Sequence, residues 1–169
     1  MKIVLLGYMA SGKSAVGRIL AKKMNLQFVD LDNFIEENEQ MNISEIFSSK
    51  GEIYFRKKES EYLTALLNKS DKLVISLGGG TPCYGDNLKL IKNKSISFYL
   101  NASIETIFNR LKNETSQRPL VASIGKDNLK EYIAKHLFER VVYYENATHS
   151  ISVNDKTLQE ISDIILELL

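Results

Sequence analysis

The chain has 169 residues, of which 44% are hydrophobic and 25% are charged, and its formal net charge is +1. This length and composition indicate one globular domain, residues 1–169, with a sizeable core. The near-neutral charge excludes a general electrostatic grip on nucleic acid or membrane, and no apolar run approaches the roughly 20 residues of a membrane span. The one cysteine, Cys83, excludes an internal disulfide and is typical of a reducing compartment. We therefore expect a cytoplasmic protein that binds neither nucleic acid nor membrane, and we also expect it to be a monomer.

The first predicted elements are a strand, a glycine-rich loop and a helix. The apolar run Ile3–Leu6 is typical of a buried strand, and the next segment, Gly7–Ser14, fits the pattern G-x-x-x-x-G-K-[ST]. Apolar residues then recur through residues 16–24 at the spacing of one helix face. Backbone N–H groups and the dipole at such a helix start favour phosphate groups. Lys13 would reach the β- and γ-phosphates and the Ser14 hydroxyl would bind Mg²⁺, so the segment predicts binding of a nucleoside triphosphate.

Strand-like runs and helical patterns continue to alternate along the chain. The later strand-like runs are Phe28–Leu31, Leu73–Leu77, Ile96–Leu100 and Ser150–Val153. Ser103 is placed to cap one helix, and Thr157 with Glu160 forms a capping box before the last helix. This alternation predicts an α/β fold with a parallel sheet covered on both faces, and ligands of such sheets gather at the carboxyl ends of the strands.

Two segments fit this alternation poorly. Residues 33–70 form a long, mostly helical insertion between two strand-like runs. Residues 113–127 are polar and weakly periodic, and a long structureless segment in a compact domain is often an active-site lid. Because Arg118 and Pro119 lie within it, we interpret this second segment as a lid.

Two further motifs lie at the predicted ligand-binding edge. Asp30 and Asp32 end the second strand-like run, where residues two apart project to the same side. One carboxylate would hold the water shell of a metal while the other faces a second substrate. The alternative is that Asp32 only caps a helix that begins near Asn33. Gly78–Gly80 closes the third run, and three glycines bring backbone N–H groups close to a ligand, although a flexible turn is the alternative.

Only five of the 22 basic residues are arginines, and arginine has the planar fork that grips carboxylate or phosphate. They are Arg18, Arg56, Arg110, Arg118 and Arg140. Arg18 is expected to be solvated, whereas Glu59 is placed to orient Arg56. His136 and His149 have no metal-ligand spacing, so no chemistry is assigned to either.

The chain resembles the shikimate kinase family, the small P-loop kinases of aromatic amino-acid synthesis, over essentially its full length. The resemblance depends on six motifs in order: the phosphate loop, Asp30-x-Asp32, Phe55-Arg56-x-x-Glu59, Gly78-Gly79-Gly80, Arg118-Pro119-Leu120 and Arg140-x-x-Tyr143. It implies a three-layer α/β/α fold like that of nucleoside monophosphate kinases, with a five-stranded parallel sheet. It also implies that residues 33–60 form a substrate-binding insertion and residues 113–127 a lid.

The resemblance further implies an activity and a role for each matching residue. The family transfers the γ-phosphoryl group of ATP to the 3-hydroxyl of shikimate, with Mg²⁺. The catalytic residues would be Lys13, Asp32 and Arg118. Residues at shikimate would be Asp32, Arg56, Gly78, Gly79, Gly80 and Arg140. Residues at the nucleotide would be Ala10, Ser11, Gly12, Lys13, Ser14, Ala15, Arg110, Arg118, Asn154 and Asp155. Ser14 and Asp30 would hold the metal, with Arg110 against the adenine.

Two positions depart from the family pattern. Many relatives carry glycine where this chain has Ala10, which matters only if the backbone there needs a positive φ. The segment Val153–Lys156 lacks the proline often seen in the adenine loop of the family, which bears on the contact with the base.

The sequence is also compatible with three other functions. A related kinase acting on gluconate or a nucleoside monophosphate would share the phosphate loop, but the arginine pair Arg56 and Arg140 favours a compact carboxylate. A GTPase would need an Asn-Lys-x-Asp guanine reader. The segment Asn68–Asp71 matches that pattern but precedes a strand instead of following one, so we interpret the match as accidental. The third is an inactive kinase-like binding module.

Overall fold

A computed structural model provides the structure of this protein and describes residues 1–114 and 119–169. Within these residues the chain forms one parallel sheet of five strands in the order β2-β3-β1-β4-β5. The strands are β1 (Lys2–Leu6), β2 (Gln27–Asp30), β3 (Leu73–Ser76), β4 (Ile96–Asn101) and β5 (His149–Ser152). The predicted parallel α/β class is confirmed.

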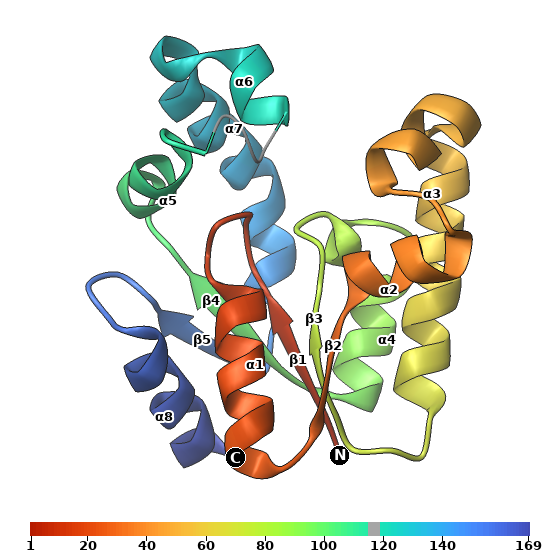
Figure 1. Cartoon of the computed structure of the whole chain (residues 1–169). Helices are drawn as coiled ribbons and strands as arrows, with labels where there is room; N and C mark the ends of the chain where they lie inside the picture. The colour runs from red at the N-terminus through yellow and green to blue at the C-terminus, as the bar shows by residue number, and fades with distance from the viewer. Residues whose placement is uncertain (115–118) are drawn as a thin grey trace.

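Helices cover both faces of this sheet. They are α1 (Lys13–Met24), α2 (Leu31–Glu39), α3 (Ile43–Asn68), α4 (Asn87–Lys94), α5 (Ile104–Leu111), α6 (Pro119–Ile124), α7 (Lys126–Tyr144) and α8 (Leu158–Leu168), with a short 3₁₀ helix, η1 (Thr81–Cys83). Figure 1 shows α1 and α8 in front of the sheet and α4 behind it, which gives three layers. None of the helices in the described part of the chain has the length and apolar character needed to cross a membrane.

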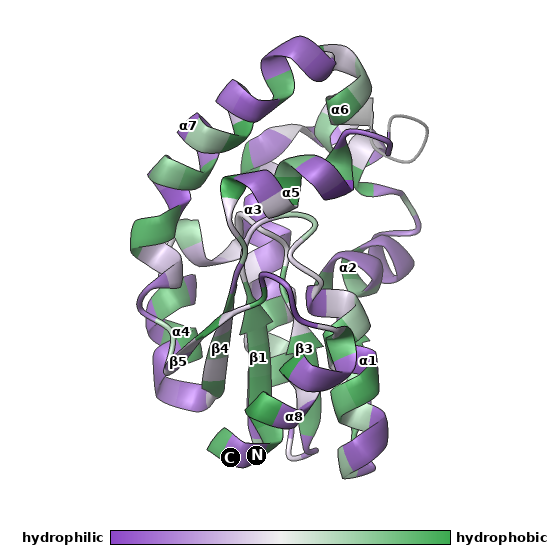
Figure 2. Ribbon diagram, turned by 90° about the vertical axis from the view of Figure 1, so that its left-hand side faces the viewer, coloured by the Kyte–Doolittle hydropathy of each residue, from purple (hydrophilic) through white to green (hydrophobic). Residues whose placement is uncertain are grey.

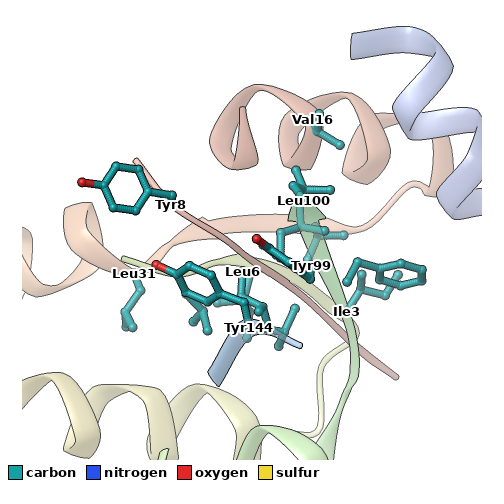
Figure 3. Packing of buried hydrophobic residues seen from close by; sticks show 14 of the residues in the cluster. Ile3, Leu6, Tyr8, Val16, Leu31, Tyr99, Leu100 and Tyr144 are labelled. Carbon is teal, nitrogen blue, oxygen red and sulfur yellow. The ribbon is translucent and has the colours of Figure 1, made fainter. Parts of the chain in front are cut away.

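The core lies along the central strands and reaches the phosphate loop. Every residue of β1 and β3 is buried, as expected for strands covered on both faces. Figure 2 shows β1 as a hydrophobic strand between helices that also carry hydrophilic residues. Tyr8, Tyr99 and Tyr144 are among the largest fully buried side chains, and the last two rings lie 5.2 Å apart (Figure 3). The base of the phosphate loop is therefore packed against the core.

Three helices begin directly after a capping residue that the sequence provides. The Ser103 hydroxyl accepts from the Thr106 N–H at the start of α5, and Thr157 with Glu160 forms a capping box at α8, both as predicted. A second capping box, Asn42 with Glu45, begins α3.

Both unusual segments contain helices among their described residues. The insertion consists of α2 and α3, and α3 bends at Gly51, where φ is +86°. Of the expected lid segment 113–127, the described residues from 119 onward include α6 and the first residues of α7, so this part is helical.

The sheet order determines where a ligand can bind. The chain leaves β1 through α1 toward β2, but leaves β3 through α4 toward β4 on the other side of β1. At such a reversal, a crevice forms outside the carboxyl ends of the two neighbouring strands. The loops that follow β1 and β3 are the phosphate loop and Gly78–Gly80, so both sequence motifs lie at this crevice.

Candidate active site

A cavity of about 440 Å³ opens at the carboxyl ends of β1 and β3. Its lining combines the phosphate loop, the end of β2 with the start of α2, the glycine turn and α5. The lining residues are Met9, Ala10, Gly12, Lys13, Ser14, Ala15, Asp30, Asp32, Leu77, Gly78, Gly79, Arg110, Glu114 and Leu158. Of the predicted nucleotide-binding residues, six line this cavity, whereas Ser11 is buried beneath it in the loop.

The phosphate loop holds its lysine inward. Lys13 is 9% exposed, and its ammonium donates to the carbonyls of Gly7 and Tyr8 at 2.9 and 2.8 Å. Gly12, with a φ of +94°, precedes the first turn of α1. The helix start and the ammonium therefore face the same space, which is the arrangement that attracts phosphate oxygens.

Ala10 adopts the backbone conformation that glycine favours. Its φ is +62°, in the left-handed region that costs a residue with a Cβ about 1–2 kcal/mol. The sequence left open whether this position needs a positive φ, and the structure shows that it does. The loop therefore keeps its shape at the cost of local strain.

Asp30 serves both a helix and a neighbouring hydroxyl. Its Oδ1 accepts from the backbone N–H groups of Asp32 and Asn33 at 3.1 and 3.3 Å, and the Ser14 hydroxyl donates to its Oδ2. The Ser76 hydroxyl lies 3.3 Å from that of Ser14. Three oxygen-bearing side chains, from α1, β2 and β3, thus lie together beside the phosphate loop.

This geometry corrects the prediction for the helix after β2. The sequence placed Asp32 at the end of the second strand, with the alternative that it only caps a helix beginning near Asn33. Instead, α2 begins at Leu31 and its cap is Asp30. Asp32 therefore lies in the first helical turn and not on the strand, because the carboxylate of Asp30 satisfies the first N–H groups. Its side chain still lines the cavity.

The carboxyl group of Asp32 has an unusual acidity. Burial, together with the neighbouring carboxylates of Asp30 and Glu59, raises its pKa from 3.8 to about 6, although the Lys13 ammonium acts in the opposite direction. A carboxyl group with a pKa near neutrality is suited to accept a proton during catalysis.

The turn Gly78–Gly80 is the point where three predicted substrate contacts meet. A Cβ on its first glycine would lie 2.8 Å from Oδ1 of Asp32. On the second it would lie 3.0 Å from Nη1 of Arg140, and on the third 2.8 Å from Nη2 of Arg56. Side chains from α2, α7 and α3 therefore converge on this turn, which has room for them only because the turn lacks Cβ atoms.

Arg56 is held from two sides. Its Nη1 donates to Oε2 of Glu59 at 2.8 Å, as the sequence predicted, and the other Glu59 oxygen accepts from the Thr81 hydroxyl at 2.7 Å. The ring of Tyr84 lies 3.9 Å below the guanidinium carbon. Glu59 is 1% exposed, so this support is buried and rigid.

Arg140 has a buried aromatic neighbour. The hydroxyl of Tyr144 donates to the Gly79 carbonyl at 2.6 Å. The sequence motif ended at Tyr143, but that side chain is 36% exposed, whereas Tyr144 is fully buried. Helical spacing alone does not distinguish the two, because residues three and four apart both lie on the face of Arg140.

Of the residues predicted to lie near the adenine, Arg110 lines the cavity, whereas Asn154 makes hydrogen bonds at the start of α5. Arg110 lines the cavity and donates to the Ala10 carbonyl at 2.8 Å. Asn154 instead accepts at Oδ1 from the Ser103 N–H and the Thr106 hydroxyl, both at 2.9 Å. Asp155 is exposed beside it. Arg118 lies outside the described residues.

Sequence reasoning missed several residues of this site. Tyr84 and Thr81 support Arg56, and Leu158 lies beside Gly12. These contacts join segments far apart in the chain, so no local pattern reveals them. Arg18 is exposed, as expected.

Comparison with known proteins gives a consistent result. Residues 9–169 match the family model described as shikimate kinase. The chain is 48% identical over 169 residues to a shikimate kinase of Flavobacterium johnsoniae, covering 99% of this chain and 98% of that protein.

Two solved structures share the fold. The crystal structure of a shikimate kinase from Bacteroides thetaiotaomicron superposes with a TM-score of 0.93 at 31% identity, covering 99% of this chain and 97% of the other. A shikimate kinase from Acinetobacter baumannii, solved in complex with shikimate, has a TM-score of 0.88 at 31% identity and covers 99% and 91%. The matched residues and the shared fold both extend over nearly the whole chain, and the protein belongs to the shikimate kinase family.

Proposed function

We propose that the protein transfers the γ-phosphoryl group of ATP to the 3-hydroxyl of shikimate, giving shikimate 3-phosphate and ADP. The hydroxyl oxygen bonds to the γ-phosphorus, the bond from that phosphorus to the β–γ bridging oxygen breaks, and the hydroxyl proton is released. The observation that carries the proposal is the convergence of Arg56, Arg140 and Asp32 on one glycine turn beside the phosphate loop. Family membership supports the same reaction.

Shikimate is a compact acid with several hydroxyl groups, and the convergent side chains match both features. The guanidinium groups of Arg56 and Arg140 would grip its carboxylate, because arginine pairs with carboxylate in a fork geometry. Asp32 would accept hydrogen bonds from adjacent hydroxyls and aim one of them at the phosphorus. The raised pKa of Asp32 supports its role as acceptor of the hydroxyl proton.

Phosphoryl transfer depends on in-line positioning and on neutralising charge at the transferring oxygens. Lys13 would supply one positive charge from inside the phosphate loop, moving from the carbonyls of Gly7 and Tyr8 to the phosphate oxygens. Arg118, assigned through the family resemblance, would supply another from the lid. Closure of the lid over the site would exclude water and so limit hydrolysis of ATP.

The donor set beside the phosphate loop fits Mg²⁺. It contains only oxygens, from Asp30, Ser14 and Ser76, and Mg²⁺ prefers one or two protein oxygens together with substrate phosphates and water. Ser14 and Asp30 would hold the ion. When bound, it would neutralise charge on the phosphate oxygens of ATP.

We further propose that the protein is a cytoplasmic monomer whose partner is a small molecule. The near-neutral net charge supports a small-molecule partner over nucleic acid or membrane, and the single cysteine supports a reducing compartment.

An acceptor screen tests the proposed reaction. ADP release would be measured with ATP and Mg²⁺ in the presence of shikimate, gluconate or a nucleoside monophosphate, and then with GTP in place of ATP. We expect turnover with shikimate and a preference for ATP. Turnover with gluconate and none with shikimate would contradict the proposal.

A matched pair of lysine variants on α1 tests the site. Lys13→Ala should lower kcat at least about 100-fold, because it removes a charge from the transferring oxygens. Lys22→Ala, at an exposed position on the same helix, should retain full activity. Equal activity of the two variants would remove Lys13 from the mechanism.

A further inference from the structure

Tyr8 links the phosphate loop to α7. Its hydroxyl lies 3.0 Å from Nδ1 of His136, and the two rings meet edge to face with centroids 5.5 Å apart. Tyr8 is 1% exposed, so the contact is shielded from water on the side of the tyrosine. Its backbone carbonyl accepts from the Lys13 ammonium at 2.8 Å and from the Ser11 N–H at 3.2 Å. The residue that shapes the loop and holds its lysine is therefore anchored through its side chain to a histidine on another element.

The same helix face also contacts the substrate side of the site. His136, Arg140 and Tyr144 are spaced four residues apart on α7 and share one face. Arg140 lies against Gly79, and the Tyr144 hydroxyl donates to the carbonyl of that glycine. One face of α7 thus contacts both the loop that would hold ATP and the turn that would hold shikimate.

We propose that His136 is a positioning residue for phosphoryl transfer. Its neutral imidazole accepts the Tyr8 hydroxyl through Nδ1 and fixes the phosphate loop relative to Arg140 on the same helix. This role rests on the proposed kinase reaction, because that reaction needs the two ligands in line.

The surroundings of His136 favour the neutral ring. The groups that face it are Tyr8 from the phosphate loop and Tyr132, Glu139 and Arg140 from α7. Burial lowers the pKa of His136 from 6.5, Arg140 lowers it further and Glu139 opposes this. Protonation would place a hydrogen on Nδ1, which then has no lone pair for the Tyr8 hydroxyl, and would add a positive charge near Arg140. The anchor is therefore intact above the ordinary pKa of histidine and is lost on acidification.

Nitrogen NMR of the histidine side chains tests the hydrogen bond without reference to activity. In the wild-type protein His136 should be the Nε2–H tautomer at neutral pH, with its signals assigned by comparison with a His149→Asn variant. Tyr8→Phe should raise the pKa of His136, because it removes a hydrogen bond to the neutral ring. An Nδ1–H tautomer, or a titration that Tyr8→Phe leaves unchanged, would overturn the proposal.

A double-mutant cycle tests the positioning role. Tyr8→Phe and His136→Leu should each lower kcat/KM for ATP about tenfold, the usual effect of losing one hydrogen bond, and the double variant should be no worse than either single one. His136→Asn should restore activity to within about threefold, since the asparagine oxygen can replace Nδ1 as acceptor. Thermal unfolding of each variant would show whether the fold is retained.

His149→Asn is the matched control, because His149 begins β5 at the end of the sheet opposite the phosphate loop and stacks on Phe98. It should leave kcat/KM unchanged. Effects that multiply in the double variant, or a His136→Leu variant as active as the wild type, would overturn the proposal. If the wild-type protein turned over no shikimate, the proposed function would fail, whereas the NMR titration would still decide whether His136 anchors Tyr8.

Discussion

Glu59 and Asp32, the two carboxylates nearest the glycine turn, differ in what their oxygens contact. The oxygens of Glu59 each accept a hydrogen bond, from Arg56 and from Thr81, so this residue orients the Arg56 guanidinium. Asp32 lies between the glycine turn and the phosphate loop, and burial raises its pKa to about 6. The first carboxylate orients a cation, whereas the second is poised to take a proton.

Asp32→Asn should separate stability from activity. The pKa of Asp32 is higher in the folded protein than the ordinary 3.8, so the folded state binds more protons in the window from 3.8 to about 6 and loses stability as pH rises through it. The variant carries no charge, so at about pH 7.5 its free energy of unfolding should exceed that of the wild type by on the order of 2 kcal/mol, and at about pH 4 the difference should vanish. Its kcat should fall by about 10²–10⁴, because asparagine does not accept the proton.

Denaturant unfolding at the two pH values, together with ADP release, measures these effects. Asp163→Asn makes the same change at an exposed carboxylate on α8 and should change neither the free energy of unfolding at about pH 7.5 nor kcat. A stability difference that is independent of pH would show that the charge on Asp32 is not the cause.

At the scale of elements, the phosphate loop contains a residue whose backbone conformation is strained. Ala10 lies in the left-handed region, and its carbonyl accepts from Arg110 on α5. The strain is tolerated because this hydrogen bond and the packing of Tyr8 fix the loop from both sides.

Ala10→Gly should therefore stabilise the protein. Glycine adopts a φ of this sign without a steric penalty, so the free energy of unfolding should rise by about 1 kcal/mol even though glycine makes the unfolded chain more flexible. Ala15→Gly, in the first turn of α1, should instead lower it by up to about 1 kcal/mol. Chemical denaturation of both variants measures the contrast. A destabilised Ala10→Gly variant would mean that the Cβ makes contacts that outweigh the strain.

The loop between β5 and α8 is tied to α5 by Asn154. Its Oδ1 accepts two hydrogen bonds at the start of that helix, so Asn154→Ala should lower the free energy of unfolding by about 1–2 kcal/mol. The KM for ATP should change little, because the side chain is committed to the helix. Asn154→Asp keeps an acceptor and should be milder. A several-fold rise in KM with unchanged stability would restore the adenine contact that the sequence suggested.

At the scale of the molecule, the strand order brings distant segments to one edge of the sheet. The phosphate loop follows β1 and the glycine turn follows β3, and these strands are neighbours although about 70 residues separate them. The insertion supplies Arg56 and α7 supplies Arg140, and Figure 1 shows α3 and α7 rising on opposite sides of this edge. The two arginines reach the same turn from these separate elements.

The sequence alone predicts those features that local chemistry determines. The phosphate loop is one contiguous motif, the strand-like runs match the five strands within one or two residues, and the capping residues identify the starts of α5 and α8. What sequence reasoning misplaced depended on one-residue shifts or on distant contacts. Asp32, expected at the end of a strand, lies in the first turn of α2, because Asp30 caps that helix. The bend at Gly51 and the anchor of Tyr8 to His136 have no local signature.

The central claim is that Arg56 and Arg140 hold the carboxylate of the acceptor beside the phosphate loop. The most direct measurement compares kcat/KM for shikimate and for its uncharged methyl ester, in the wild-type protein and in Arg56→Met. We predict that the wild type prefers the acid by about 100-fold or more, as expected for a charge-assisted pair, and that the variant loses most of this preference while its activity on the ester changes little. An equal preference in the two proteins would contradict the account, because the carboxylate would then be recognised elsewhere.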